Sequence, residues 1–252
     1  MAIALVQSKS GTIDTGDSLV VTCDANVAAG NLVLVAVAQR DESKAITVSG
    51  LGATWTEIAN VDNTQGQGGI SLWRCSNANG STAAVTVTVT GSTVPTCVVV
   101  AEFSGVDVAT TDGIEASATT AGPGTDDNDM LLAVTTVTDN AWAVAAGWGR
   151  GQALTLPGGE TAIQINVVTD PGLGNVTRCH LWYQGPVSPA ASTQLGALDD
   201  LSANGDWAMI VVAVKPSGGG TTYTKAGAAV AAVVTSGADV FEAVKAGMAV
   251  CD

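Results

Sequence analysis

The chain has 252 residues, enough for one large or two ordinary domains with a buried core. Acidic residues outnumber basic residues by 23 to 9, and because the resulting net charge of −14 repels phosphate backbones, we expect no nucleic-acid partner. No apolar run approaches the roughly 18 residues that span a bilayer. Residues 1–6 also lack the basic region of a signal peptide. We therefore expect a soluble protein made in the cytoplasm, with no membrane partner.

The first 105 residues read as short strands separated by turns. Valine and threonine alternate strictly over Val85–Thr90, which predicts a half-buried strand, whereas Leu32–Gln39 and Cys97–Ala101 are nearly unbroken apolar runs, typical of strands covered on both faces. Five further strands are expected at Ile3–Ser8, Ser18–Cys23, Ala45–Val48, Thr54–Ala59 and Ile70–Cys75. With no helical periodicity, this pattern predicts an all-β fold, an antiparallel sandwich of jelly-roll type.

The second half repeats this pattern less faithfully. Ile114–Gly122 resembles Ile3–Gly11, and the offset is 111 residues (114 minus 3). Trp207–Lys215 resembles Thr96–Ser104 at the same offset (207 minus 96). We also interpret Asp129–Val137 as the counterpart of Asn31–Gln39, and Thr177–Tyr183 as that of Ser71–Cys75. The sequence therefore predicts an internal duplication, with lobes at 1–107 and 108–216.

The composition changes after Lys215. Residues 216–222 form a Gly/Ser-rich linker, and 223–252 are rich in alanine, glycine and valine. The pattern Lys-Ala-Gly-x-Ala-Val occurs at Lys225–Val230 and again at Lys245–Val250, a period of 20 residues (245 minus 225). Ser236 or Asp239 would cap a short helix there, while strand or extended chain remains open. We expect 217–252 to be a linker and assembly tail that docks on another subunit.

No constellation of residues predicts catalysis. His180 is the only histidine and no Gly-x-Ser-x-Gly elbow accompanies it, so we expect a strand histidine with a structural hydrogen bond. The acidic clusters Asp126–Asp129 and Asp199–Asp200 are interpreted as solvated turns rather than calcium sites. Nothing singles out a glycosidase pair among the acids, and Gly66–Gly68 has no phosphate-loop context. We therefore assign no catalytic, metal-binding or cofactor-binding residue and do not predict an enzyme.

The tryptophans and cysteines each allow two interpretations. Core packing is favoured over sugar stacking for most of the tryptophans, and Trp148, between Gly147 and Gly149, is the best candidate for exposure. The six tryptophans are Trp55, Trp73, Trp142, Trp148, Trp182 and Trp207. The five cysteines contain no Cys-x-x-Cys pair, so we expect free, buried thiols, with a Cys75–Cys97 bridge as the alternative in an oxidising compartment.

Four features give the chain a resemblance to accessory virion proteins of tailed bacteriophages, namely β-sandwich head-decoration and minor tail proteins. They are the Asn31–Val37 strand, Leu72-Trp73 with the Val/Thr alternation at 85–90, Ala101–Asp107, and the Ala/Gly-rich tail from Tyr223. The resemblance implies a non-enzymatic protein of the virion, assembled in the host cytoplasm, most simply a capsid decoration protein. Its partners would be the major capsid protein or tail proteins and further copies of itself, which we take to form a trimer. The alternative is a carbohydrate- or receptor-binding module of a tail or fibre.

Overall fold

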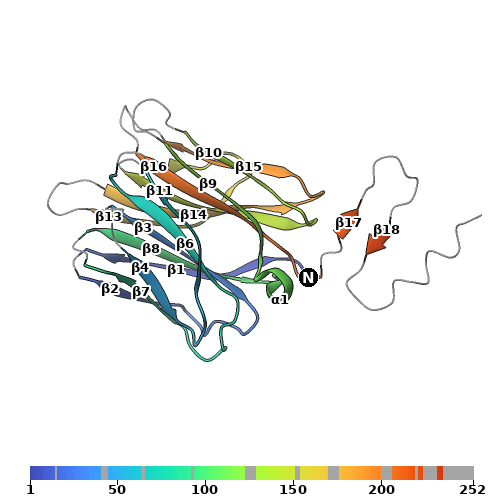
Figure 1. Cartoon of the computed structure of the whole chain (residues 1–252), viewed down its shortest axis with the longest axis horizontal. Helices are drawn as coiled ribbons and strands as arrows, with labels where there is room; N and C mark the ends of the chain where they lie inside the picture. The colour runs from blue at the N-terminus through green and yellow to red at the C-terminus, as the bar shows by residue number, and fades with distance from the viewer. Residues whose placement is uncertain are drawn as a thin grey trace, which may run out of the picture.

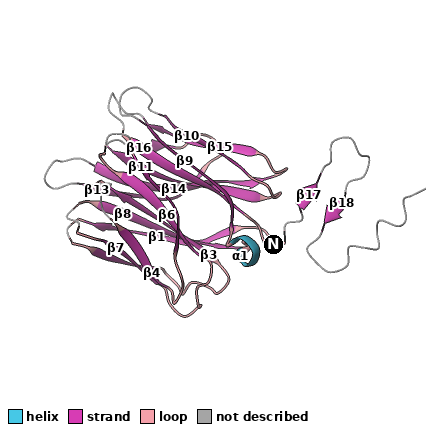
Figure 2. Cartoon of the chain, viewed as in Figure 1, coloured by secondary structure: helices cyan, strands magenta, loops and turns pink. Residues whose placement is uncertain are grey.

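The computed structural model describes residues 1–14, 16–40, 45–63, 66–91, 94–122, 129–150, 154–169, 176–199, 206–218, 221–223 and 232–234. Within these residues the chain is almost entirely antiparallel β-structure, as predicted (Figure 2), and the only helix, α1 (Val108–Thr111), is a single turn. No helix in this part of the chain is long and apolar enough to cross a membrane.

Strands β1 to β8 form two sheets, which we call lobe 1 (Figure 1). Inner sheet 1 has the order β1-β8-β3-β6-β5, and outer sheet 1 has the order β2-β7-β4. All eight strands predicted for this half are present, with boundaries moved by a few residues. Their bounds are β1 (Ala4–Ile13), β2 (Ser18–Thr22), β3 (Leu32–Gln39), β4 (Ile46–Gly50), β5 (Thr56–Asp62), β6 (Gly69–Cys75), β7 (Ala84–Val89) and β8 (Thr96–Ser104).

Strands β9 to β16 form lobe 2, also with two sheets. Inner sheet 2 has the order β13-β14-β11-β16-β9, and outer sheet 2 has the order β10-β15-β12. When β9 to β16 are matched in sequence to β1 to β8, both orders are those of lobe 1. The bounds are β9 (Ile114–Gly122), β10 (Asp129–Thr135), β11 (Ala141–Arg150), β12 (Leu154–Thr155), β13 (Thr161–Thr169), β14 (Val176–Val187), β15 (Ser192–Asp199) and β16 (Trp207–Val214).

The four sheets stack in layers, with the two inner sheets facing each other. One apolar cluster lies between the inner sheets and draws on both lobes, including Leu34 and Phe103 from lobe 1 and Trp148 and Ile210 from lobe 2. Two smaller clusters fill the space between each inner sheet and its own outer sheet. The largest core is therefore the one that joins the lobes, and the central strands β3, β8, β11 and β16 are buried on both faces.

This layering explains the unbroken apolar runs in the sequence. In β3, Leu34 and Ala36 face the core shared with lobe 2, while Val35 and Val37 face outer sheet 1. Alternate side chains of a strand point to opposite faces, so a strand with sheets on both sides needs apolar residues at every position. All eight residues of β3 are buried, as the sequence predicts for a strand covered on both faces.

The lobes meet along two seams between edge strands of the inner sheets. At one seam β1 of lobe 1 lies against β13 of lobe 2. At the other seam β9, which matches β1 in strand order, lies against β5, which matches β13. Polar side chains join the first seam: Gln164 Nε2 donates to Ser10 Oγ at 3.2 Å, and Asn166 Nδ2 donates to the Gly11 carbonyl at 2.6 Å. The lobes therefore pack as one body rather than as two domains on a flexible linker.

Both ends of the described body meet beside the turn that connects the lobes. Val106 forms an isolated β-bridge with Pro216, and the Ser217 N–H donates to the Gly105 carbonyl at 2.8 Å. The Met1 ammonium donates to the Ser217 carbonyl. Gly105 has φ +71°, and a Cβ there would lie 2.0 Å from the Ala2 carbonyl oxygen, so only glycine fits. The point where the tail leaves the body is thus fixed.

Three sequence-based interpretations need correction. Asp129–Val137 is not the counterpart of Asn31–Gln39, because β10 occupies the place of β2 in its sheet and β11 occupies that of β3. Strands β12 and β15 were not predicted. The Cys75–Cys97 bridge is wrong, because both thiols are free and their side chains lie in different cores on opposite faces of inner sheet 1.

Part of the tail forms two short strands. β17 (Thr221–Tyr223) pairs in antiparallel fashion with β18 (Ala232–Val234). The remaining tail residues, including the predicted caps Ser236 and Asp239, lie outside the described residues. That the tail docks on another subunit stays a prediction.

Candidate functional site

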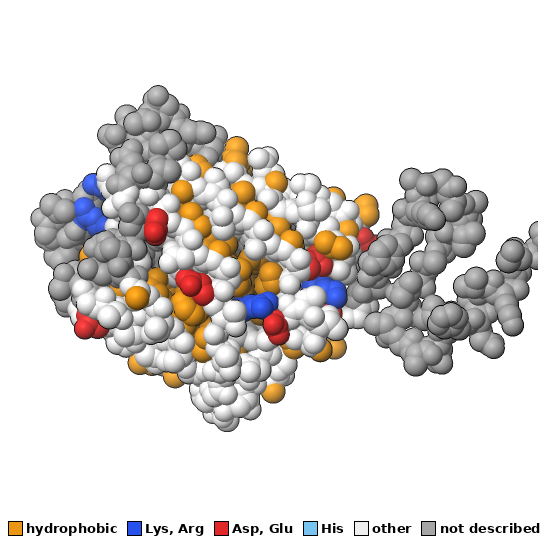
Figure 3. Space-filling model, in the orientation of Figure 1, with side chains coloured by type: hydrophobic (Ala, Val, Ile, Leu, Met, Phe, Trp, Pro, Cys, Tyr) orange, Lys and Arg blue, Asp and Glu red, His pale blue; other side chains and the backbone are white. Residues whose placement is uncertain are grey.

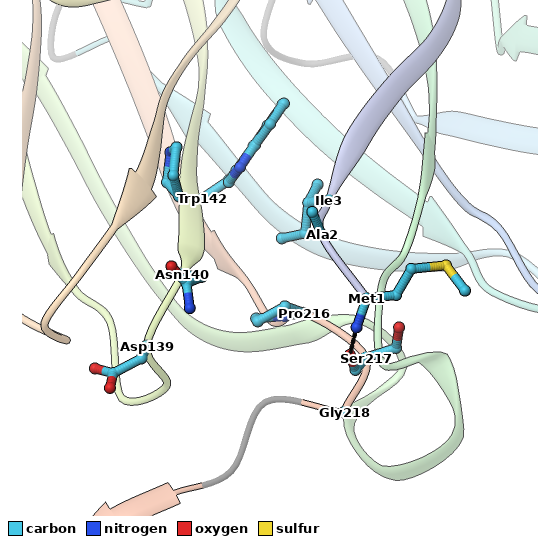
Figure 4. Close-up of a pocket in the computed structure, with 10 residues that line it drawn as sticks. Met1, Ala2, Ile3, Asp139, Asn140, Trp142, Pro216, Ser217 and Gly218 are labelled. Carbon is cyan, nitrogen blue, oxygen red and sulfur yellow. Dashed lines mark hydrogen bonds between the residues drawn. The ribbon is translucent and has the colours of Figure 1, made fainter.

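A pocket of about 440 Å³ opens where the tail leaves the body, and we call it the exit pocket (Figure 4). Its lining comes from both lobes, from the start of the chain and from the beginning of the tail. The lining residues are Met1, Ala2, Ile3, Asp139, Asn140, Trp142, Pro186, Pro216, Ser217 and Gly218. The site is a junction of segments that are distant in the sequence.

The inner wall of the exit pocket is rigid and apolar. Trp142 stacks on Tyr183, with ring centroids 4.3 Å apart and an interplanar angle of 5°, and it meets the edge of Phe103 at 6.3 Å. A Cβ on residue 185 would lie 2.4 Å from the Trp142 ring, so Gly185 leaves the space that the indole occupies. Trp142 is therefore held in place before any ligand arrives.

The rim of the exit pocket is polar. Asp139 Oδ1 accepts a hydrogen bond from the Ala190 N–H at 2.7 Å, which fixes the turn before β11. Asn140 has φ +64°, a left-handed conformation that asparagine tolerates better than most residues. Pro216 and the Met1 ammonium lie on the opposite side (Figure 4). An apolar floor with one carboxylate at the rim suits a short chain segment that carries a cation.

A second, smaller hollow of about 210 Å³ lies at the junction of lobe 1 and the inter-lobe turn, and we call it the polar hollow. Arg74 Nη2 pairs with Asp112 Oδ2 at 3.1 Å, and Arg74 Nη1 donates to the Thr111 carbonyl at 3.1 Å. These contacts tie α1 to β6. The hollow is lined by Thr54, Thr56, Arg74, Ser76, Asn77 and Asp112, a set of hydroxyl, amide and charged groups that can bind a polyol.

The carboxylates give neither pocket the acid pair that glycoside hydrolysis uses. The exit pocket has Asp139 and the polar hollow has Asp112. Buried Glu102 accepts hydrogen bonds from the Ala28 N–H at 2.9 Å and from Asn31 Nδ2 at 2.6 Å, so it anchors the loop before β3. Burial raises the pKa of Asp206, and the Arg150 guanidinium, 3.3 Å away, partly offsets this effect.

His180 lies inside lobe 2 with only 2% of its surface exposed. Neither ring nitrogen has a hydrogen-bond partner among the residues that the structure describes, so the predicted structural hydrogen bond is wrong. Burial lowers the pKa of His180 to about 3, and the charge of Arg178 acts in the same direction. The ring is therefore neutral at pH 7 and lies outside both pockets.

The tryptophans are mainly core residues, and the predicted exposure of Trp148 is wrong. Trp148 is fully buried and packs against Gly68 of lobe 1, where a Cβ would lie 2.4 Å from its ring. The flanking glycines serve the opposite face of β11, because Trp182 and Met130 pack against Gly147. Trp142, Trp182 and Trp207 are also buried, and Trp55 and Trp73 are half-buried against the core of lobe 1.

The remaining candidate residues are not brought together. Asp126–Asn128 and Asp200 lie outside the described residues, and no group of three or more metal-binding side chains is found among those that are described. Burial raises the pKa of the Cys97 thiol to about 12, so this cysteine is an unreactive core residue. Cys23, Cys75 and Cys179 are likewise buried and free, as predicted, and Cys251 lies outside the described residues.

Charged side chains are sparse on the surface. Figure 3 shows acidic and basic groups scattered singly or in pairs among mostly uncharged atoms. Several of the few cations are paired with carboxylates, as in Lys9 with Asp24 at 2.8 Å and Lys215 with Asp107 at 2.9 Å. The face seen in Figure 3 is thus largely uncharged, while the chain as a whole has an acidic excess.

Sequence reasoning did not find the exit pocket. Asp139, Asn140 and Pro186 carry no motif, and Trp142 was assigned only to the core. The one usable signal was the run of turn residues at both Thr138–Asn140 and Gly185–Pro189, which flanks the strand pair β11 and β14 at the same end.

Comparison with known proteins identifies no relative: no protein-family model matches the chain, and neither a curated protein nor a solved structure is significantly similar to it.

Proposed function

We propose that this chain is a structural, non-enzymatic protein of a bacteriophage virion, a capsid decoration protein that binds the assembled shell and neighbouring copies. The strand order carries the proposal. In each lobe the first, eighth, third, sixth and fifth strands form one sheet, and the second, seventh and fourth form the other. Apart from the place of the fifth strand, this order resembles that of a jelly roll, an architecture used by viral capsid and lectin domains.

The repeated order supports a duplicated jelly-roll-like sandwich. Both lobes match in all eight strand positions, and the offset of 111 residues recurs at β1 with β9 and at β8 with β16. A single lobe would leave one face of its inner sheet uncovered. In the two-lobe body this face of each inner sheet is buried against the other in the shared core. Such a closed block, with a mostly neutral surface, suits a protein that is displayed on a particle in many copies.

The test is direct binding to particles of the source virus that lack the protein. Purified full-length chain, labelled with a fluorophore, is sedimented with the particles, and unlabelled chain is added as a competitor. We expect saturable, competable binding with a fixed number of copies per particle and ordered density at symmetry-related sites by cryo-electron microscopy. Absence of saturation, or density at no fixed site, would refute the proposal.

The polar hollow favours a second candidate, a carbohydrate- or receptor-binding module of a tail or fibre. Its hydroxyl and amide groups are those that hold a sugar, although no tryptophan lines it. Glycan binding that is lost in Asn77→Ala but kept in Asn26→Ala, an exposed asparagine outside the hollow, would support this candidate. Trp148→Ala is not informative here, because that indole is buried in the core.

A further inference from the structure

The exit pocket lies beside the root of the tail, and no described tail residue beyond Gly218 lines it. Ser217 and Gly218 form part of the pocket wall, and β17 begins three residues after Gly218 (221 minus 218). Figures 1 and 2 draw the β17–β18 hairpin clear of both lobes. Residues 224–231, which connect β17 and β18 in the sequence, lie outside the described residues.

The two described strands of the tail form a sheet of their own. β17 and β18 pair only with each other in their sheet. A two-stranded ribbon is marginally stable in water unless it adds strands or packs on an apolar surface. The chain therefore presents, on the same molecule, a hairpin that needs a surface and a preformed apolar pocket that is open.

The connection of the hairpin complements the exit pocket in size and charge. Residues 224–231 read Thr-Lys-Ala-Gly-Ala-Ala-Val-Ala, a single lysine followed by small apolar residues. A volume of about 440 Å³ accommodates several such side chains against Trp142 and Pro216. The carboxylate of Asp139 at the rim is a partner for the Lys225 ammonium, because an opposite charge at a partly desolvated rim favours docking.

We propose that the exit pocket binds the β17–β18 hairpin connection, residues 224–231, of a second copy of this chain. The inference rests on the proposed function in one respect: an ordered shell holds copies close enough for each tail to reach its neighbour. Donor hairpin and acceptor pocket are different surfaces, so the contact is heterologous, and copies join head to tail into rings or chains. The tail thus acts as the link between decoration subunits.

The test uses full-length chains with one defect each. Ala2→Trp fills the pocket from an exposed position in its lining and leaves the tail intact. Ala228→Asp places a carboxylate in the connection, where it would be repelled by Asp139. We expect the wild-type chain to form higher oligomers in sedimentation velocity, and each variant alone to remain monomeric, with self-association weakened at least tenfold. An equimolar mixture of the two variants should form a dimer and stop there.

Matched controls separate docking from general damage. Ala4→Trp adds the same indole at an exposed position outside the pocket, and Ala246→Asp adds the same charge in the second Lys-Ala-Gly segment. Both are expected to associate as the wild type does. Circular dichroism melting of every variant reports whether the body still folds.

Three outcomes would overturn the inference: a wild-type chain that stays monomeric, a mixture that does not form the dimer, or an Ala2→Trp variant that associates as well as Ala4→Trp. If Ala2→Trp only increases hydrogen exchange in its own tail, the tail docks within one chain, and docking on a second copy is wrong. Particle binding is measured separately. Loss of particle binding with intact tail-linked oligomers would refute the proposed function alone, and the reverse result would refute this inference alone.

Discussion

Lobe 1 and lobe 2 share one strand order but differ in how well their outer sheets cover them. In lobe 1 the outer strands have five or six residues each, and the core beneath them is built from valine, isoleucine and leucine. In lobe 2 the counterpart of β4 is β12, which has only two residues. Among the described residues, the outer sheet of lobe 2 is therefore shorter at this edge than that of lobe 1.

The edge strands of the two inner sheets also differ. Ile165 and Val167 of β13 are 45% and 39% exposed, whereas the exposed residues at matching places in β5, Asn60 and Asp62, are polar. His180 of β14 is buried with no hydrogen-bond partner among the described residues, and the indole N–H of Trp148 in the shared core is likewise without one. The shared core is nevertheless the largest apolar cluster, and it draws on both lobes. Stability should thus be concentrated between the lobes and be lowest in the outer sheet of lobe 2, which the following predictions test.

The largest effect is expected at the shared core. Trp148→Ala removes a fully buried indole that packs against Gly68 of the other lobe. We expect a loss of about 3–5 kcal/mol in the free energy of unfolding, the usual range for truncating a buried aromatic residue. Urea denaturation should still show one transition, because both lobes depend on this core. Separate transitions for the two lobes would contradict the layered arrangement, and Val20→Ala on the exposed face of β2 is the control.

The next effect is acid sensitivity caused by His180. Its pKa is about 3 in the folded chain because burial disfavours the charged ring, against 6.5 for the unperturbed side chain. Between these values the unfolded chain binds a proton that the folded chain does not, so stability is lost as the pH falls from 6.5 toward 3. The slope is at most about 1.4 kcal/mol per pH unit for one group.

His180→Leu should remove this sensitivity. Between pH 7 and pH 4 we expect the variant to lose roughly 2–3 kcal/mol less than the wild-type chain in urea denaturation. Burial raises the pKa values of Glu57, Asp62 and Glu160, which acts with the opposite sign, but this contribution is common to both proteins and cancels in the comparison. Equal pH dependence in the two proteins would mean that His180 reaches water or a partner in solution.

A smaller effect is expected in the local stability of the outer sheets. Amides of β15 in lobe 2 should exchange with deuterium at least tenfold faster than amides of β7 in lobe 1, a difference of about 1.4 kcal/mol in opening free energy. The physical reason is that β15 pairs with the two-residue β12 on one side, whereas β7 pairs with full strands on both sides. Equal protection would show that the outer layers are equally stable.

The sequence predicted most of lobe 1 because each of its strands has a clear period. Val85–Val89 alternates because one face of that strand is buried, and β3 is apolar up to its last residue, Gln39, because both of its faces are buried. Lobe 2 was harder. β15 contains Gly196 between Leu195 and Ala197, which breaks the pattern, and β12 is too short to have one. Its neighbour β10 was consequently matched to the wrong strand of lobe 1.

The candidate sites could not be predicted from sequence because long-range packing creates them. Trp148 seemed exposed since glycine flanks it, but those glycines make room for Trp182 and Met130. The exit pocket joins Met1, Trp142 and Pro216, which are brought together only when both lobes have folded. Conversely, the free state of the described cysteines followed from their number and spacing alone.

The smallest effect distinguishes two ion pairs in different settings. Lys215 and Asp107 join the end of lobe 2 to the inter-lobe turn at 2.9 Å, with side chains only 20% and 17% exposed, whereas Lys9 and Asp24 are 39% and 72% exposed. Partial burial acts to raise the pKa of Asp107, but hydrogen bonds from Thr110 and Lys215 lower it below its ordinary value. Lys215→Met should cost about 1 kcal/mol at pH 7 and Lys9→Met less than about 0.5 kcal/mol.

Because the folded-state pKa of Asp107 is depressed, the contribution of the Lys215 pair should fade as the pH drops below about 4. A cost for Lys9→Met that equals that for Lys215→Met would mean that the inter-lobe turn is no better fixed than an ordinary surface strand.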